Sequence, residues 1–150
     1  LAARLLAKVI KRTPVGDYSR EIEVVAKKDG KKHKKGDVYK KRVNTTGKRG
    51  GTLRRGWTSS SHEEAAAGGS PTAAKQYADS LTINHAGNMI SIEIVNPVEY
   101  ASYVEYGHRT PDHQGWVPGR FMLTLSEQEI QEIAPNVLEA KITSFLKGVT

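Results

Sequence analysis

The residues best suited to chemistry lie in one short polar stretch near the middle of the C-terminal half. His108, Asp112 and His113 lie within six residues of one another and close to Glu105. Imidazoles and carboxylates gathered in this way could hold a metal ion or exchange protons with a substrate. The spacing matches no established ligand set, however, and Arg109 would repel a cation. A polar surface turn is the favoured interpretation, and a metal-dependent nuclease is the weakest alternative.

Other catalytic patterns are absent from the sequence. Residues 59–63 include the residue types of a Ser–His–acid triad, but residues adjacent in sequence cannot adopt the geometry of a triad. There is no phosphate-binding glycine loop and no nucleophile elbow. His33, His62 and His85 each stand alone and are predicted to be exposed loop residues. Because the chain also has no cysteine, we expect neither an enzyme nor a cofactor or metal site.

The charge of the chain is strongly uneven. The net charge is +7, with most of the excess between residues 27 and 55, whereas residues 121–150 are slightly acidic. Such asymmetry indicates a polyanionic neighbour, and nucleic acid is the first candidate. A solvated basic loop is the alternative for any single charge run. The residues expected to face DNA or an acidic partner are Lys31, Lys32, Lys34, Lys35, Arg54 and Arg55.

The segment from Asn96 to Gly107 has the signals of a helix that is capped at both ends. Asn96 is a good N-cap, Pro97 suits the first helical position, and Glu99 can bond back to the cap. Gly107 offers the left-handed residue that ends a helix of about three turns. We take this helix as the element around which the remaining segments pack.

Aromatic residues line this helix and the segment that follows it. They could stack on single-stranded bases, but at helical spacing they are more often core or subunit interface. Trp116, between Gly115 and the Val117–Gly119 segment, is predicted to lie in the core. The residues predicted to form an oligomer interface are Tyr100, Tyr103, Glu105 and Tyr106.

The pattern of apolar residues assigns the other elements. Residues 1–12 predict a helix that packs on a sheet, and two hairpins are predicted: 21–26 with 37–43, whose tip is basic, and 80–84 with 89–95. Residues 52–61 read as a strand with Leu53 and Trp57 as anchors and Gly56 as a point of close approach. Residues 60–76 are expected to form a mobile loop. Two C-terminal helices, 124–133 with Ser126 as cap and 136–147, are separated at Pro135.

Together these elements predict an α+β fold in one domain, residues 1–150. It consists of a small antiparallel sheet packed against an N-terminal helix and C-terminal helices. The basic hairpin, within about residues 17–50, is thin in apolar residues and is expected to project as an arm that neighbours help to order. No apolar run is long enough to span a membrane, and no signal peptide is visible.

Several motifs and their order resemble the gene-product-ten family of tail components, which are neck or tail-completion proteins of long-tailed bacteriophages and prophages. The resemblance covers most of the chain except the arm at about residues 17–50, which reads as an insertion. The matching residues are Thr13-Pro14-Val15, the 51–57 segment Gly-Thr-Leu-Arg-Arg-Gly-Trp, Val95-Asn96, Tyr100-Ala101, Val104-Glu105-Tyr106-Gly107, and Pro118 with Phe121.

This resemblance implies a structural protein of the virion or of a phage-tail-like particle, assembled in the bacterial cytoplasm. Such a protein forms a homo-oligomeric ring that joins head and tail or caps the tail tube, with six-fold symmetry favoured and twelve-fold possible. The implied partners are adjoining neck, tail-terminator or tail-tube proteins and, in the channel, non-specific DNA. The alternative from a different class is a stand-alone basic nucleic-acid-binding protein.

Overall fold

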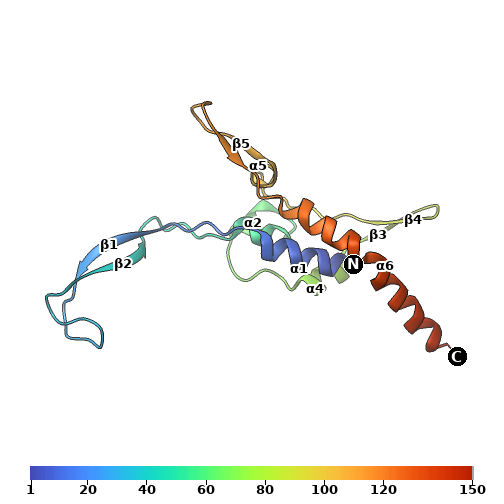
Figure 1. Ribbon diagram of the computed structural model, residues 1–150, viewed down its shortest axis with the longest axis horizontal. Helices are drawn as coiled ribbons and strands as arrows, with labels where there is room; N and C mark the ends of the chain where they lie inside the picture. Colours follow the sequence, from blue (N-terminus) through green and yellow to red (C-terminus); the bar gives the residue numbers. More distant parts are fainter. Residues whose placement is uncertain (150) are drawn as a thin grey trace. The chain divides into compact units, whose positions relative to one another are not determined.

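The computed structural model describes residues 1–149 and confirms the α+β class (Figure 1). Its helices are α1 (Ala2–Arg12), α2 (Thr52–Gly56), α3 (His62–Ala66), α4 (Ala74–Ser80), α5 (Ala101–Tyr106) and α6 (Met122–Lys147). Its strands are β1 (Ser19–Val25), β2 (Val38–Asn44), β3 (Ile83–Ala86), β4 (Met89–Ile92), β5 (Gly107–Arg109) and β6 (Trp116–Pro118). The strands form three separate antiparallel pairs, β1–β2, β3–β4 and β5–β6, instead of one sheet.

The chain divides into two units. One comprises residues 1–14 together with the chain from residue 51 onward, and the other comprises residues 15–50. We call them the helical unit and the hairpin unit. No helix in the described residues is long and apolar enough to cross a membrane.

The hairpin unit is built on the β1–β2 ladder. Seven residue pairs run from Ser19 opposite Asn44 to Val25 opposite Val38. One face carries the partly buried side chains Ile22, Val24, Tyr39 and Val43, so the alternation that predicted a hairpin here is present. Buried hydrophobic residues are nearly absent: in this unit only Ala26, at the end of β1, is buried.

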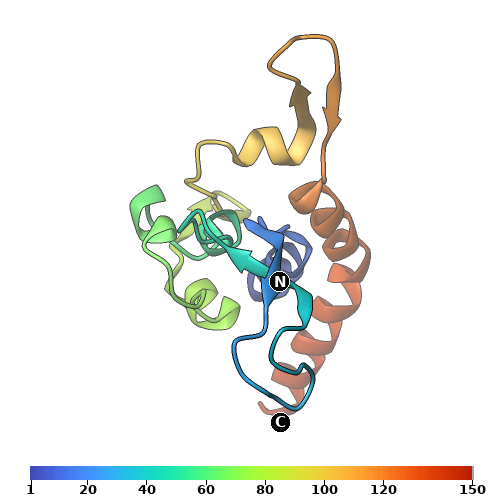
Figure 2. The same ribbon diagram turned by 90° about the vertical axis from the view of Figure 1, so that its left-hand side faces the viewer.

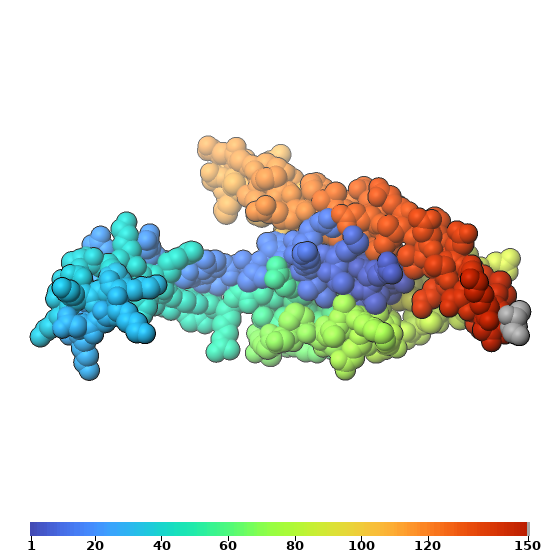
Figure 3. All heavy atoms as spheres, turned by 60° about the horizontal axis from the view of Figure 1, so that its bottom comes forward, coloured from blue at the N-terminus to red at the C-terminus, as the bar shows by residue number. Residues whose placement is uncertain are grey.

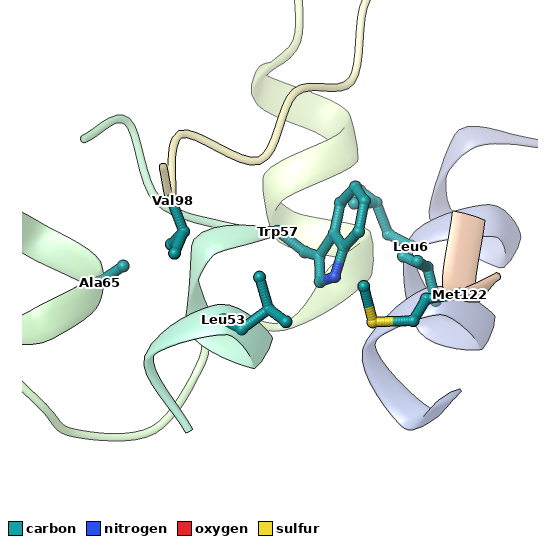
Figure 4. Packing of buried hydrophobic residues seen from close by; sticks show 7 residues of the cluster. Leu6, Leu53, Trp57, Ala65, Val98 and Met122 are labelled. Atoms are coloured by element: carbon teal, nitrogen blue, oxygen red, sulfur yellow. The ribbon is translucent and has the colours of Figure 1, made fainter. Parts of the chain in front are cut away.

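The helical unit has a compact core made by helices (Figure 4). The buried cluster consists of Leu6, Val9, Leu53, Trp57, Ala65, Val98 and Met122. The apolar stripe of α1 therefore packs on α2, α4 and α6, not on a sheet as predicted. The helix itself was predicted correctly, and its apolar side buries Leu6 and Val9, because the same stripe can pack on helices as well as on a sheet.

The segment predicted as a strand, 52–61, begins with the short helix α2. Leu53 and Trp57 are buried as expected, and Gly56 is a point of close approach because a Cβ there would lie 2.2 Å from Asn96 Oδ1. The two anchors are four residues apart, which places them on one face of a helix. The strand assignment was therefore wrong, whereas the anchors were correct.

Thr13, at the end of α1, links α1 to α2 by buried hydrogen bonds. Its hydroxyl donates to Val9 O (2.6 Å) and accepts the indole N–H of Trp57 (2.8 Å). Its carbonyl accepts from the guanidinium of Arg54 at 2.5 Å and 3.1 Å. The hydroxyl and the carbonyl of Thr13 therefore both have partners, as buried polar groups require.

Two further stretches differ from the predicted elements. Helix α3 lies in the stretch expected to be a loop, with Ala65 fully buried and Ser61 Oγ accepting the amide of Glu64 as an N-cap. At the C-terminus one helix, α6, runs through Pro135, since proline costs a helix one hydrogen bond without necessarily ending it. Ser126 is not a cap: it is buried inside α6 and donates to Met122 O.

Candidate assembly surfaces

Helix α5 starts later than the capping signals predict. Asn96 does not cap it: its amide donates to Leu53 O (2.9 Å), and its side-chain oxygen accepts from the Val98 amide (3.2 Å). These bonds hold residues 96–98 against α2 and bury Val98 in the core. The helix then forms only from Ala101, and it ends at Gly107 as predicted.

Glu105 is the structural centre of this region. The residue is buried, and its carboxylate accepts the backbone amides of Leu123 and Thr124, both at 2.9 Å, and the Thr124 hydroxyl at 2.8 Å. Those amides belong to the first turn of α6, which has no cap from its own N-cap residue, Phe121. A carboxylate on α5 thus caps α6 and complements the positive end of its dipole. Glu105, predicted at an oligomer interface, lies inside the protomer.

Two glycines allow the two sides of the hairpin between α5 and α6 to approach closely at its base (Figure 2). A Cβ on Gly119 would lie 2.3 Å from Glu105 O, and one on Gly107 would lie 2.5 Å from Val117 O. Gly107 also has φ = 87°, which disfavours other residues. The backbone segments before and after the β5–β6 hairpin are therefore in close contact at these two glycines.

The aromatic side chains of this region point to solvent. Tyr103, Tyr106 and Trp116 are each about 60% exposed, at 59%, 62% and 60%, and Tyr100 is 41% exposed. The prediction that Trp116 is core was wrong: within residues 1–149 the side chain on β6 stays largely exposed. We call Tyr100, Tyr103, Tyr106 and Trp116 the aromatic surface.

The polar stretch after Gly107 forms the β5–β6 hairpin. The hydroxyl of Thr110 donates to Asp112, and Asp112 also accepts the amide of Gln114 (3.2 Å). These bonds lower the pKa of Asp112 below its ordinary value, and the bond from the Thr110 hydroxyl has the larger effect. His108 lies against the ring of Tyr103, with ring centroids 5.9 Å apart. In residues 1–149 no group of three His, Asp or Glu side chains could hold a metal ion.

The six predicted basic partner residues lie in different units. Lys31, Lys32, Lys34 and Lys35 are exposed at the tip of the hairpin unit. Arg54 and Arg55 belong to α2, and their guanidinium groups donate to the carbonyls of Thr13 and Ala65. The two arginines therefore stabilise the helical unit, whereas the four lysines are available to a partner.

A second apolar surface, not assigned from the sequence, follows Pro135 on α6. Leu138, Ile142 and Phe145 recur at intervals of four and three residues and so share one face of α6, with Leu146 beside it; Val149 follows in the turn after the helix ends. All five are at least half exposed, up to 71% for Phe145, and these last turns of α6 lie at the surface (red in Figure 3). We call these five residues the α6 stripe. The sequence shows the spacing of these residues, but it does not show whether another element covers them.

The β3–β4 hairpin exposes apolar residues as well. The predicted hairpin is present, and Ile83, Met89, Ile90 and Ile92 are all exposed. Close by in sequence, a pocket of about 220 Å³ lies between the segment before α5, α5 itself and the start of α6. Its lining includes Trp57, Ile94, Tyr106 and Leu123. The helical unit thus presents several exposed apolar features.

Comparison with protein families gives a match to the model described as "Bacteriophage HK97-gp10, putative tail-component", over residues 37–107. The match runs from the start of β2 to the end of α5 and covers somewhat under half of the chain. Comparisons with curated proteins and with solved structures gave no match. The family match confirms the resemblance for the motifs that lie within residues 37–107.

Proposed function

We propose that the chain is the subunit of a homo-oligomeric ring at the neck of a tailed phage or a phage-tail-like particle. In this role it completes the tail, joins it to the head or caps the tail tube, and its adjoining partners are other neck, terminator or tube proteins. Six-fold symmetry is favoured over twelve-fold by the family resemblance. The observation that carries the proposal is the pair of exposed apolar surfaces on one helical unit, the aromatic surface and the α6 stripe.

Two different surfaces are what a closed ring needs. In a head-to-tail interface one surface of each subunit meets a different surface of the next, and the ring forms when the rotation closes. Tyrosine and tryptophan are enriched at interfaces because they bury much area while a polar group remains hydrated. We assign the aromatic surface to one side of the interface and the α6 stripe to the other.

The arrangement of Glu105 fits this assignment. Its carboxylate ties α5 to α6 inside the protomer, so the tyrosines on α5 are held in place by a buried contact. A rigidly held aromatic surface loses less conformational freedom on association, which favours binding. Interface and support are therefore separate: Tyr103 and Tyr106 make contact, and Glu105 positions them.

The experiment is a complementation test on two variants. One variant carries Tyr103→Ala and Tyr106→Ala, and the other carries Ile142→Ser and Phe145→Ser. Each alone should be a folded monomer by light scattering, because each lacks one side of the interface. An equimolar mixture should give dimers but no rings, since one intact contact remains between the two variants. The matched control is Tyr18→Ala, an exposed tyrosine of the hairpin unit.

Other outcomes contradict the proposal in distinguishable ways. Normal rings from both variants, with clearly lower melting temperatures, would show that these side chains stabilise the protomer instead. A mixture that stays monomeric, while each variant keeps its fold, would mean that the two surfaces do not bind each other.

A further inference from the structure

We propose that the tip of the hairpin unit, residues 27–35, binds the phosphate backbone of duplex DNA without regard to base sequence. We call these residues the lysine tip. The inference concerns a site in a different unit from the assembly surfaces, and it does not depend on ring formation.

The first argument is the distribution of charge. Residues 15–50 contain 12 Lys and Arg against 5 Asp and Glu, a net charge of +7. The remainder of the chain contains 11 of each and is neutral. The whole net charge of the protein is therefore carried by the hairpin unit.

Within that unit the positive and negative charges of the two strands nearly balance, whereas those of the tip do not. Across the ladder Glu21 lies opposite Arg42 and Glu23 opposite Lys40, and Asp17 pairs with Arg42 at 2.7 Å. The tip, in contrast, holds six lysines and one acid, Asp29. In residues 1–149 no ion pair engages the ammonium group of any of these six lysines. All six are exposed: Lys27, Lys28, Lys31, Lys32, Lys34 and Lys35.

The acids next to the lysines are used to fold the tip. Asp29 accepts the backbone amide of Lys35 (2.8 Å), and Asp37 accepts that of Lys34 (2.7 Å). The ring of His33 stacks on Tyr39 of β2, with centroids 4.1 Å apart and planes 8° apart. The carboxylates and the imidazole therefore shape the loop, and the lysine ammonium groups are left for a ligand.

The ordered backbone keeps six like charges within nine residues. Gly36 N donates to Ala26 O and Ala26 N to Asp37 O, both at 2.9 Å, and these bonds close the loop at its base. Six like charges on one short loop repel one another in the free protein, and salt screens this repulsion over a Debye length of about 8 Å. A polyanion relieves this repulsion.

The chemistry of the tip favours phosphates over a protein face or a membrane. No apolar side chain occurs from Lys27 to Gly36, so the tip lacks the anchors that protein interfaces and membrane insertion need. It also lacks the Arg, Asn and Gln side chains that read base edges in the major groove. Lysine is a flexible point charge that contacts phosphates irrespective of the base.

The expected strength follows from counterion release. Six lysines that each neutralise one phosphate give a slope of about −5 in log Kobs against log salt. The affinity then falls about a thousandfold between 50 and 200 mM NaCl. This salt dependence is the signature that we expect for the site.

The test measures anisotropy of a labelled duplex of about thirty base pairs with the full chain, at several salt concentrations. In the tip variant all six lysines are changed to Gln; we expect an affinity at least about a hundredfold lower and a slope near zero. In the matched control six exposed cations of the helical unit are changed to Gln, which leaves the same net charge. These are Arg4, Lys11, Arg109, Arg120, Lys141 and Lys147.

Three results would overturn the proposal: no duplex binding by the natural sequence, an equal loss in the control variant, or a slope unchanged in the tip variant. Binding to anionic phospholipid vesicles in place of the duplex would overturn it too. A tip variant with all six lysines changed to Arg should retain binding, and Lys31→Gln with Lys32→Gln should reduce the slope by about two if the six-fold variant does not fold. The Tyr103→Ala, Tyr106→Ala variant should bind normally, which separates this site from ring formation.

Discussion

The helical unit and the hairpin unit are stabilised in different ways. In the helical unit, side chains from distant segments meet in one buried cluster, and Thr13 and Glu105 satisfy the polar groups around it. In the hairpin unit the ladder of β1 and β2 supplies the structure, and Ala26 is the one buried hydrophobic residue there. Two-stranded hairpins of this kind are marginal alone. The unit that carries the charge therefore contributes no residue to the buried cluster, and we expect that it can change without loss of the fold.

The largest expected difference in stability between the two units comes from a substitution in the buried core of the helical unit. Trp57→Ala removes a buried indole and its hydrogen bond to Thr13, and we expect it to lower the free energy of unfolding by about 3–5 kcal/mol. Tyr39→Ala, an aromatic residue of the hairpin unit, should change the main unfolding transition by less than about 1 kcal/mol. Urea unfolding of both variants measures the difference. Equal losses would show that one cooperative core spans both units.

The next effect concerns the contact between α5 and α6. Glu105→Gln keeps the size of the side chain but weakens the charged cap of α6, and we expect a loss of about 1–3 kcal/mol. Exposed Glu99 provides the control, since Glu99→Gln should change stability by less than about 0.5 kcal/mol. Thermal unfolding followed by circular dichroism measures both, and similar melting temperatures for the two variants would contradict the cap.

A smaller, pH-dependent contribution to stability is expected from the ion pairs between α1 and α6. Lys8 and Arg12 pair with Glu129 at 2.5 Å and 2.6 Å and lower its pKa from 4.5. A lowered carboxyl pKa adds stability above the unfolded value, and that stability is lost as the pH falls through the folded value. Glu129→Gln should therefore melt slightly below the natural protein at pH 7, and the gap should close below pH 4.5. A gap that persists in acid would mean that packing, not charge, is lost.

Removal of the hairpin unit is the largest change to the chain, but we expect it to have the smallest effect on the stability of the helical unit. The hairpin unit starts and ends at adjacent points, because a Cβ on Gly50 would lie 2.0 Å from Gly16 O. Replacing residues 17–49 by a short glycine–serine linker should leave the melting temperature of the helical unit unchanged within a few degrees. Loss of the folded state would show that the hairpin unit is part of the core. The deletion should also impair particle assembly.

The sequence predicted which residues are inward-facing better than it predicted their elements. Leu53 and Trp57 were identified as anchors because large apolar residues in a polar stretch have few alternatives to burial. Their strand assignment failed because two residues four apart fit more than one pattern. Ser126 was expected as a cap, since the sequence does not show that α6 already starts at Met122.

The candidate site was less predictable than the fold class. The predicted interface tyrosines are exposed, but Trp116 was assigned to the core because its neighbours are apolar. Exposure depends on whether another element covers the residue, which no local pattern contains. The role of Glu105 was hidden for the same reason: its partners, Leu123 and Thr124, are 18 and 19 residues away, and only the close approach at Gly107 and Gly119 brings them together.

The carboxylate of Glu105 also has a mechanical consequence. Because it bonds two amides in the first turn of α6, a neighbour that displaced α5 would pull on the start of α6 through one side chain. Helix α6 continues for 26 residues and ends at the stripe, so force applied to the tyrosines reaches the opposite contact surface along a stiff rod. In the proposed ring, strain at one subunit boundary would thereby be transmitted to the next.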